Sequence, residues 1–317
     1  MIFAFVLGIV PIILWAERKL LGRFQSRVGP NRVGFKGLMQ PAADVLKLLS
    51  KEGSTPETAV PWMMAIAPVI SIVTAVATLA VIPWGPKGAW GGDVGLYGID
   101  VSIGVLYFFA FGSLAFYGLM LGGWASGSKY SFLGAMRSAA QLISYEVSLG
   151  LSLLGVAMTA GSLSLVKIVE TQIGDGQTWY ILPQLVGFVI FMVAGFAETN
   201  RAPFDLPEAD AELVAGYNTE FGGMRFGTFF MAEYMEVVVI SGIATAVFLG
   251  GWHGPGPEWL GPLWVLLKML ALIFLFIWVR ATLPRFRYDQ LMSFGWKVLL
   301  PLTTVNVVVT AIVVVLV

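Results

Sequence analysis

Several carboxylates in this sequence lie where a lipid-facing charge would be costly. Glu146 occupies the middle of the apolar run LISYEVSLGLSLL, and Glu233 and Glu236 are three residues apart in FFMAEYMEVVVISG. Charged side chains inside apolar spans usually face a bundle interior or a water-filled path. Glu233 and Glu236 share a helix face, so a low dielectric would couple their titrations. Protonatable sites are the favoured interpretation. A structural ion pair for Glu146 and snorkelling to the interface for the other two are the alternatives.

A longer acidic segment joins these spans. Residues 198–236 contain eight Asp or Glu and two Arg, a net charge of −6. Apolar residues are interleaved with the carboxylates in ETNRAPFDLPEADAELVAGYNTEFGGMRF, which indicates packing against another surface, although a solvated acidic loop is the usual alternative. Buried carboxylates that repel one another are suited to taking up and releasing protons.

A basic segment balances the acidic one. Residues 17–51 contain eight Lys or Arg and two acids, a net charge of +6, and Arg280, Arg285 and Arg287 form a second cationic border. By composition alone, contact with anionic lipid is an equally good interpretation of the basic segment. Within it, the apolar residues of 35–51 recur near helical spacing, which predicts an amphipathic helix lying in the membrane interface; an ordinary packed loop helix is the alternative.

The whole composition defines the class of protein. Of 317 residues, 57% are hydrophobic and 12% are charged, against about 25% charged in soluble domains. Net charge is zero, cysteine is absent and His253 is the single histidine. These facts exclude a soluble enzyme, a disordered chain, a cysteine-ligated cluster and a multi-histidine metal site. We therefore expect no metal in this chain.

Apolar runs long enough to cross a bilayer of roughly 30 Å predict an all-α integral membrane protein, a single polytopic domain over 1–317. The basic segments favour a cytoplasmic position for 17–61, 124–135, 200–228 and 283–291, and both termini then face outward. About eight spans are expected, with the interfacial helix in addition, near 1–20, 62–83, 101–123, 136–160, 179–199, 229–250, 262–282 and 292–316.

Five stretches together resemble one family, the H-type membrane subunit (mitochondrial ND-one type) of proton-pumping NADH–quinone oxidoreductase, or respiratory complex I. They follow the family order across nearly the whole chain. The stretches are ERKLLGRFQSRVGPNRVGFKGLMQPAADVLKLLSKE, LISYEVSLGL, ETNRAPFDLPEADAELVAGYNTEF, MAEYMEVVVIS and VRATLPRFRYDQLM.

The resemblance implies a role for each matching residue. Asp210 departs from the usual Glu of the family, which retains the charge but shortens its reach. The quinone chamber would be lined by Glu17, Arg18, Arg27, Phe204 and Asp205. The proton path would contain Glu146, Glu198, Glu208, Asp210, Glu212, Glu233 and Glu236, supported by the basic residues Arg137, Arg201 and Arg280.

The resemblance also implies partners and place. Ubiquinone or menaquinone would be the substrate, with FMN and the iron–sulfur clusters on partner subunits. Partners would be the peripheral-arm quinone-site and iron–sulfur subunits, small membrane subunits, antiporter-like subunits and membrane lipids, but no nucleic acid. A bacterial plasma membrane is favoured over a mitochondrial inner membrane. The chain would not be catalytic alone.

Three rival functions remain as hypotheses. The nearest is a homologous membrane subunit of a membrane-bound hydrogenase or formate hydrogenlyase, which needs no quinone; the stretch GRFQSRVGPNRVG favours the quinone enzyme. A stand-alone transporter predicts internal repeats with broken spans, and we find no such repeats. A structural anchor predicts indifference to changes at Glu146 and Glu208.

Overall fold

A computed structural model describes residues 2–87, 95–173, 178–206 and 215–316, and these residues form helices joined by loops, without a β-strand among them. The all-α prediction is confirmed for this part of the chain. In chain order the helices are α1 (Ile2–Phe24), η1 (Phe35–Gly37), α2 (Gln40–Ser50), α3 (Pro61–Leu79), α4 (Gly104–Ala125), α5 (Lys129–Ala160), α6 (Leu165–Thr171), α7 (Leu185–Glu198), η2 (Gly216–Asn218), α9 (Gly223–Phe248), η3 (Glu258–Leu260), α10 (Gly261–Thr282), α11 (Tyr288–Phe294), η4 (Gly295–Leu299) and α12 (Leu300–Leu316).

Six helical stretches in the described residues are long and apolar enough to cross a membrane: α3, α4, α5, α9, η3 with α10, and α11 through α12. The chain is therefore an integral membrane protein by composition and helix length. The sequence predicts about eight. The two expected spans outside the six are α1, whose last eight residues include four charged ones, and α7, which has only 14 residues.

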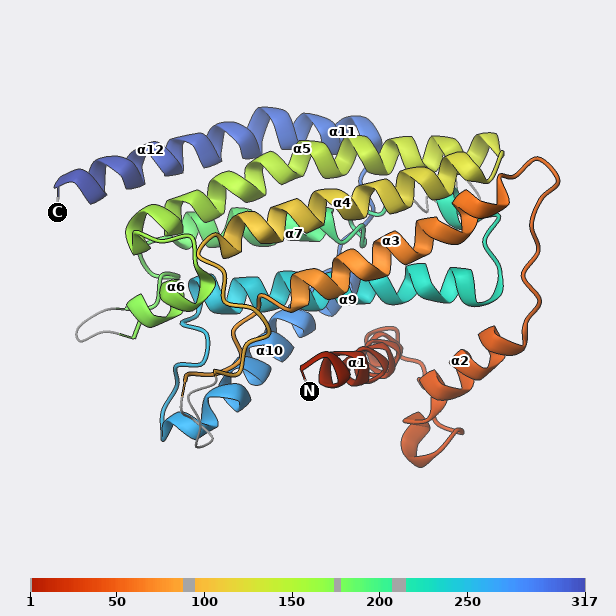
Figure 1. Ribbon diagram of the computed structural model, residues 1–317, viewed down its shortest axis with the longest axis horizontal. Helices are drawn as coiled ribbons and strands as arrows, with labels where there is room; N and C mark the ends of the chain where they lie inside the picture. The colour runs from red at the N-terminus through yellow and green to blue at the C-terminus, as the bar shows by residue number, and fades with distance from the viewer. Residues whose placement is uncertain (1, 88–94, 174–177, 207–214, 317) are drawn as a thin grey trace.

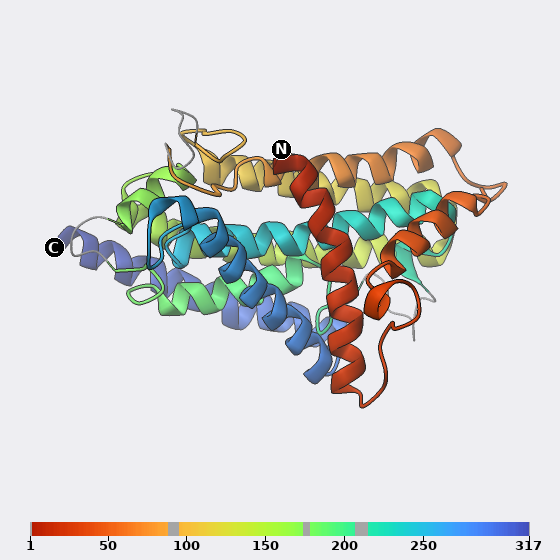
Figure 2. The ribbon, with the colours of Figure 1, turned by 90° about the horizontal axis from the view of Figure 1, so that it is seen from below.

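The helices divide into a bundle and two crossing elements. Figure 1 shows α12, α5, α4, α3, α7 and α9 running roughly along one direction, with α9 beneath α4 and α7. Figure 2 shows α1 crossing this bundle steeply, with α10 running obliquely beside it. Most of α9 is buried. Charged residues at the steep crossing of α1 can therefore meet the middle of α9 rather than its end.

Small residues allow a close contact between α3 and α4. A Cβ atom placed on Gly118 of α4 would lie 3.0 Å from the carbonyl oxygen of Ala67 and would overlap Oγ of Ser71, both on α3. Only glycine fits this crossing, since any side chain would push the two backbones apart. The close contact holds α3 and α4 as one wall beside α9.

The chain after α7 is fixed to its neighbours by side-chain and backbone hydrogen bonds. The buried amide of Gln141 on α5 donates from Nε2 to the carbonyl oxygens of Ala197, at 2.7 Å, and Phe204, at 2.8 Å. From the other side, the amide of Phe286 donates to the carbonyl oxygen of Pro203, at 3.1 Å. The turn that contains Arg201 and Phe204 is thereby held against the bundle.

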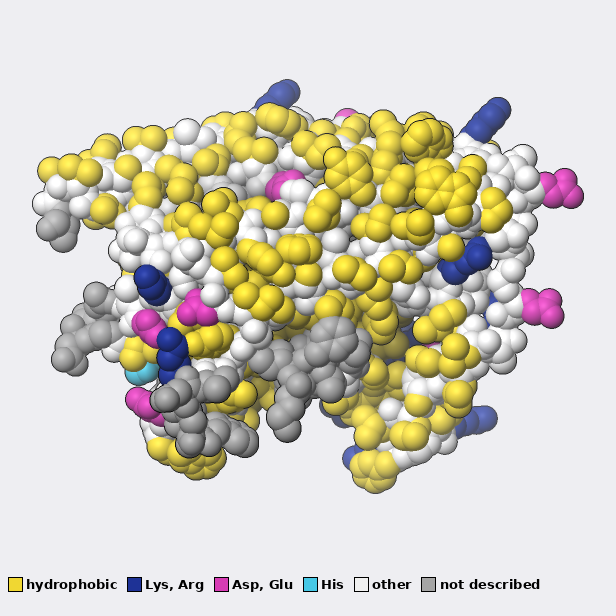
Figure 3. All heavy atoms as spheres, in the orientation of Figure 1, with side chains coloured by type: hydrophobic (Ala, Val, Ile, Leu, Met, Phe, Trp, Pro, Cys, Tyr) yellow, Lys and Arg dark blue, Asp and Glu magenta, His cyan; other side chains and the backbone are white. Residues whose placement is uncertain are grey.

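The surface agrees with a membrane environment. In Figure 3, hydrophobic side chains cover most of the visible face, and charged ones gather toward the ends and the lower edge. The short helix α2 has exposed Val45, Leu46 and Leu49 beside Lys47, and Pro41 lies in its first turn, where proline fits a helix. The exposed part of α2 therefore combines apolar side chains with a lysine, and its place in the membrane interface stays a prediction.

Candidate functional site

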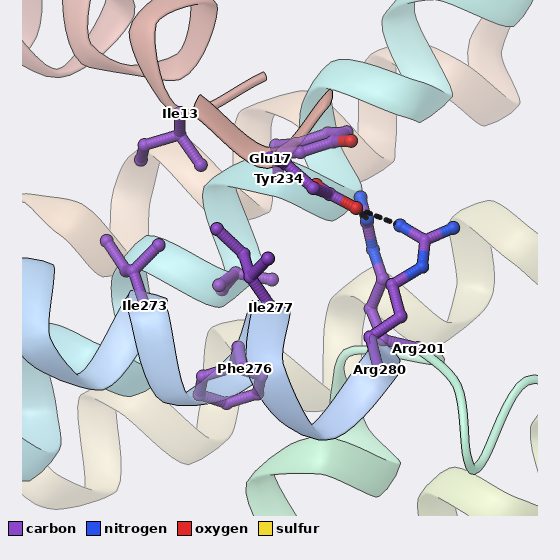
Figure 4. Close-up of a pocket in the computed structure, with 9 residues that line it drawn as sticks. Ile13, Glu17, Arg201, Tyr234, Ile273, Phe276, Ile277 and Arg280 are labelled. Carbon is purple, nitrogen blue, oxygen red and sulfur yellow. Dashed lines mark hydrogen bonds and ion pairs between the residues drawn. The ribbon is translucent and has the colours of Figure 1, made fainter. Parts of the chain in front are cut away.

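Four charged side chains from four separate elements meet inside the molecule. Glu17 comes from α1, Arg201 from the turn after α7, Glu233 from α9 and Arg280 from the last turn of α10. Arg201 Nη1 lies 3.2 Å from Glu17 Oε1, Arg201 Nε lies 2.5 Å from Glu233 Oε1, and Arg280 also pairs with Glu17. Figure 4 shows Arg201 and Arg280 converging on Glu17. We call these four residues the ion cluster.

Burial makes the ion cluster energetically sensitive. The side chains of Glu17, Arg201 and Glu233 are 5%, 7% and 14% exposed, whereas Arg280 is 36% exposed. Two carboxylates and two guanidinium groups cancel in formal charge. Burial lowers the pKa of the Arg201 guanidinium, but the carboxylates of Glu233 and Glu17 outweigh burial and raise that pKa above its ordinary value. Arg201 therefore stays charged, and it binds both carboxylates.

An aromatic ring and an apolar slot border the ion cluster. The guanidinium carbon of Arg201 lies 3.9 Å from the centroid of the Tyr234 ring, a cation–π contact. A narrow apolar slot of about 20 Å³ opens beside the cluster, between α1, α9 and α10, and its apolar lining includes Ile13 and Ile277. Figure 4 shows these two side chains to the left of the charged groups. The slot has room for about one water molecule and ends against charge.

A second acidic group lies one helical turn away. Glu236 on α9 and Glu198 at the end of α7 line a small cavity of about 30 Å³ between α3, α4, α7 and α9. Glu198 Oε2 is buried without a hydrogen-bond partner among the described residues. Beside this cavity, Glu146 of α5 accepts a hydrogen bond from the Ser113 hydroxyl of α4. The cavity is polar enough to hold water between carboxylates.

Together these residues form a row of ionisable groups. Glu236 interacts electrostatically with both Glu233 and Glu198, and Glu198 interacts with Glu146. The row therefore runs from the ion cluster at Glu233, through Glu236 and Glu198, to Glu146 on α5. Their spacing predicts that Glu233 and Glu236 share a helix face and interact. In the structure they do interact, and each also has a neighbour of its own, since Glu233 pairs with Arg201 and Glu236 shares a cavity with Glu198.

The structure changes the predicted grouping. The resemblance places Glu17 in the quinone chamber and places Arg201 and Arg280 beside the proton path, whereas all three belong to one cluster. Arg18 pairs with Asp44 of α2 at 2.5 Å.

Other predicted chamber and supporting residues lie outside the ion cluster. Arg27 is exposed and donates to Gln25, Phe204 is buried between the rings of Tyr145 and Phe286, the Asp205 carbonyl accepts from Arg285, and Arg137 lies on α5 nine residues before Glu146.

Three predicted carboxylates, Glu208, Asp210 and Glu212, lie outside the described residues. Sequence reasoning also missed two positioning residues, Gln141 and Tyr234. Gln141 is an amide inside the apolar run of α5, and Tyr234 stands beside a carboxylate inside a span; a polar group in an apolar span is the signal that could have revealed either.

Fold and site together define a class: a polytopic helical membrane protein whose interior holds a row of ionisable groups. Among the described residues, no cluster of His, Cys, Asp or Glu is arranged to hold a metal ion. The sequence model of the NADH dehydrogenase family matches residues 1–311. The chain belongs to this family.

Relatives from several bacteria are similar over almost the full length. One of the H-type subunits of NADH-quinone oxidoreductase in Geobacter metallireducens is 52% identical over 312 residues, covering 98% of this chain and 93% of the relative. The H-type subunit of Syntrophotalea carbinolica is 50% identical over 311 residues, covering 96% and 92%. That of Thermomicrobium roseum is 50% identical over 316 residues, covering 97% and 92%.

Proposed function

We propose that this chain is the H-type membrane subunit of a proton-translocating NADH–quinone oxidoreductase and is not catalytic alone. The observation that carries the proposal is the row of ionisable groups from Glu17 to Glu146, which crosses four helices inside a membrane protein. The names of the relatives support the same function. They favour the quinone enzyme over a hydrogenase or formate hydrogenlyase subunit.

In this proposal one end of the row borders the quinone chamber. Glu17, Arg18, Arg27, Phe204 and Asp205 would be the chamber residues, and a neutral quinone would approach the ion cluster from its apolar side. Quinone reduction consumes protons and changes charge near the chamber. Because Glu17 shares Arg201 with Glu233, a change in the charge at Glu17 alters the field at Glu233 directly.

The acidic residues would then transmit that change along the row. A proton gained or lost at Glu233 changes the electrostatic energy of Glu236, and the effect continues through Glu198 to Glu146. Arg137, Arg201 and Arg280 would set the resting charge of the path. The carboxylates of the acidic segment would form its loading end, namely Glu208, Asp210 and Glu212.

We also propose the topology of the chain. Including α1 and α7 gives eight membrane-spanning helices in one polytopic domain, with 17–61 as a basic cytoplasmic loop and 198–236 as an acidic segment. The exposed apolar residues of α2 would lie in the interface. Both termini would face the outside of a bacterial plasma membrane.

The proposed partners divide the chemistry. Peripheral-arm subunits would hold FMN, the iron–sulfur clusters and the rest of the quinone site, while small and antiporter-like membrane subunits would receive the charge signal. Ubiquinone or menaquinone would be the substrate. The absence of cysteine from this chain fits its having no cluster of its own.

The experiment replaces Glu146 and Glu208 separately with Gln in the assembled complex, with Glu57→Gln as a control at an exposed loop carboxylate. Positioned proton-transfer groups contribute roughly 10²–10⁴-fold, so quinone-coupled proton uptake into vesicles should fall at least about tenfold in both site variants. The control should behave like the unmodified complex. Unchanged quinone reduction together with unchanged pumping in both site variants would contradict the proposal.

A further inference from the structure

A large apolar cavity lies apart from the ion cluster. It has a volume of about 580 Å³ and lies between α7, the turn after α7, the end of α10 and α11. Among the described residues of the lining, Gln290 is the one side chain with a polar group; the others are apolar and include Phe196, Phe204, Leu283 and Phe294. Leu283, Phe286 and Phe294 are partly exposed, so the space opens to the surface of the helices. An open apolar space of this size suits an apolar molecule.

The walls of this cavity are fixed in place. The Phe286 amide donates to the Pro203 carbonyl at 3.1 Å, and the Tyr145 hydroxyl donates to the Leu291 carbonyl at 2.8 Å. The ring of Phe204 packs against that of Phe286, with centroids 5.6 Å apart. These contacts join opposite walls, so the cavity is preformed.

Two cations flank a lining residue of the cavity. Phe286 lines it, and Arg285 and Arg287 precede and follow Phe286 in the chain. Arg285 donates to the Asp205 carbonyl, and Arg287 makes an exposed pair with Asp289 at 3.4 Å. An exposed pair of this kind is weak, so an anion can compete for Arg287. Two guanidinium groups thus lie one residue away from the cavity lining in the chain.

We propose that this cavity binds an anionic phospholipid, with an acyl chain inside it and the phosphate on Arg285 and Arg287. Basic pockets between membrane helices on the cytoplasmic side suit anionic headgroups. Among the described residues of the lining, a quinone ring would find only Gln290 as a hydrogen-bonding side chain, and a partner helix would not need the two cations beside Phe286. The proposal does not depend on the proton path.

Lipid bound here would act on the turn that holds the site. An acyl chain would pack against Phe204, which is three residues from Arg201, and Arg285 joins the headgroup site to the Asp205 backbone. Occupancy would therefore stabilise this turn in the conformation that presents Arg201 to the ion cluster.

The test uses the assembled complex in phosphatidylcholine nanodiscs that contain a small fraction of phosphatidylglycerol with a diazirine on one acyl chain. After illumination, labelled peptides are identified by mass spectrometry. Peptides covering 283–294 should be labelled. The double variant R285Q/R287Q should bind about 30-fold more weakly, from about 1 kcal/mol per arginine and tenfold per 1.4 kcal/mol.

Two further arms keep the test decisive. Leu283→Trp fills the cavity without changing charge and should lower labelling at least fivefold, while the matched control Lys129→Gln, an exposed cation at the start of α5, should leave it unchanged. If R285Q/R287Q does not assemble, Leu283→Trp and the lipid comparison below decide.

Four results would overturn the proposal. They are equal labelling by the phosphatidylcholine analogue, unchanged labelling in R285Q/R287Q, displacement of the lipid by a quinone analogue, and cross-links from 283–294 to a partner subunit. The readout is labelling rather than turnover, so failure of the proposed proton path would leave this test unaffected.

Discussion

Replacing Arg201 with Gln is the sharpest test of the ion cluster. Arg201 binds Glu17 through Nη1, at 3.2 Å, and Glu233 through Nε, at 2.5 Å, with the side chain 7% exposed. Gln carries no charge, and its amide nitrogen ends two bonds short of the Nη1 atom that contacts Glu17. The substitution therefore leaves two buried carboxylates with one cation, Arg280, instead of two.

The magnitude follows from that imbalance. Removing one partner of a buried ion pair costs about 3–5 kcal/mol, because the remaining charge stays buried. Glu17 keeps Arg280, so we expect the lower end, about 3 kcal/mol. In the double variant R201Q/E233Q the numbers of carboxylates and cations are equal again. The free energy of unfolding of the double variant should be about 2 kcal/mol higher than the sum of the two single effects predicts. This difference is the coupling energy between Arg201 and Glu233.

Amide hydrogen exchange of the assembled complex measures this loss of stability around the ion cluster. Peptides covering 199–206 and the first half of α9 report the opening of the turn and of the helix that Arg201 joins. A loss of about 3 kcal/mol corresponds to exchange roughly 150-fold faster in R201Q. Arg23→Gln, an exposed arginine near the end of α1, is the matched control and should leave these peptides unchanged.

Exchange in R201Q that stays within twofold of the unmodified complex would contradict the expected cost. Exchange in R201Q/E233Q that equals the sum of the two single effects would show that the effect does not come from the pair. A uniform acceleration throughout the chain in R201Q would indicate general unfolding rather than loss of the cluster.

Two further predictions concern side chains that donate to backbone carbonyls at or beyond the ends of α9 and α7. Lys268 donates from Nζ to three backbone carbonyls, among them that of Leu249 at 2.6 Å, at the end of α9. Lys268→Met leaves these carbonyls unpaired and should lower the local free energy of unfolding by about 1–3 kcal/mol. Amide exchange at 249–253 should become faster, with quinone turnover unchanged. Gln141→Leu removes the hydrogen bonds to the carbonyls of Ala197 and Phe204. Amide exchange at 199–206 should accelerate about tenfold or more. Unaltered exchange there would show that Gln141 does not hold the turn.

Much of the fold could be predicted because long apolar runs determine helices locally. The expected spans 101–123 and 262–282 correspond closely to α4 and α10. The span expected over 179–199 is shorter, since α7 begins at Leu185. Its preceding segment instead bonds to another helix, with the Ile181 amide donating to the Phe248 carbonyl at 2.9 Å. Periodicity along a chain cannot reveal such a contact between distant segments.

Charged candidates could be picked out from the sequence, but their pairing could not. Glu233 stands out as a carboxylate inside an apolar span, and this is visible without a structure. Glu17 lies at the end of an apolar run beside Arg18 and Lys19, and the resemblance is what indicates it. Arg201 is 184 residues from Glu17, and Arg280 is 263 residues from Glu17. Pairing over such separations depends on how α1 crosses α9 and α10, which the apolar pattern of each helix leaves open.

The zero net charge has a structural meaning once the pairs are known. The basic segment 17–51 contains two acids, and the acidic segment 198–236 contains two arginines. One acid of the first, Glu17, pairs with one arginine of the second, Arg201. Glu17 is an acid within the basic segment, and Arg201 is a base within the acidic segment. The overall attraction between the two segments therefore does not predict this pair. The pair joins α1 to the acidic segment at one buried point. A change of charge at Glu17 or Arg201 therefore alters the electrostatic energy of both segments.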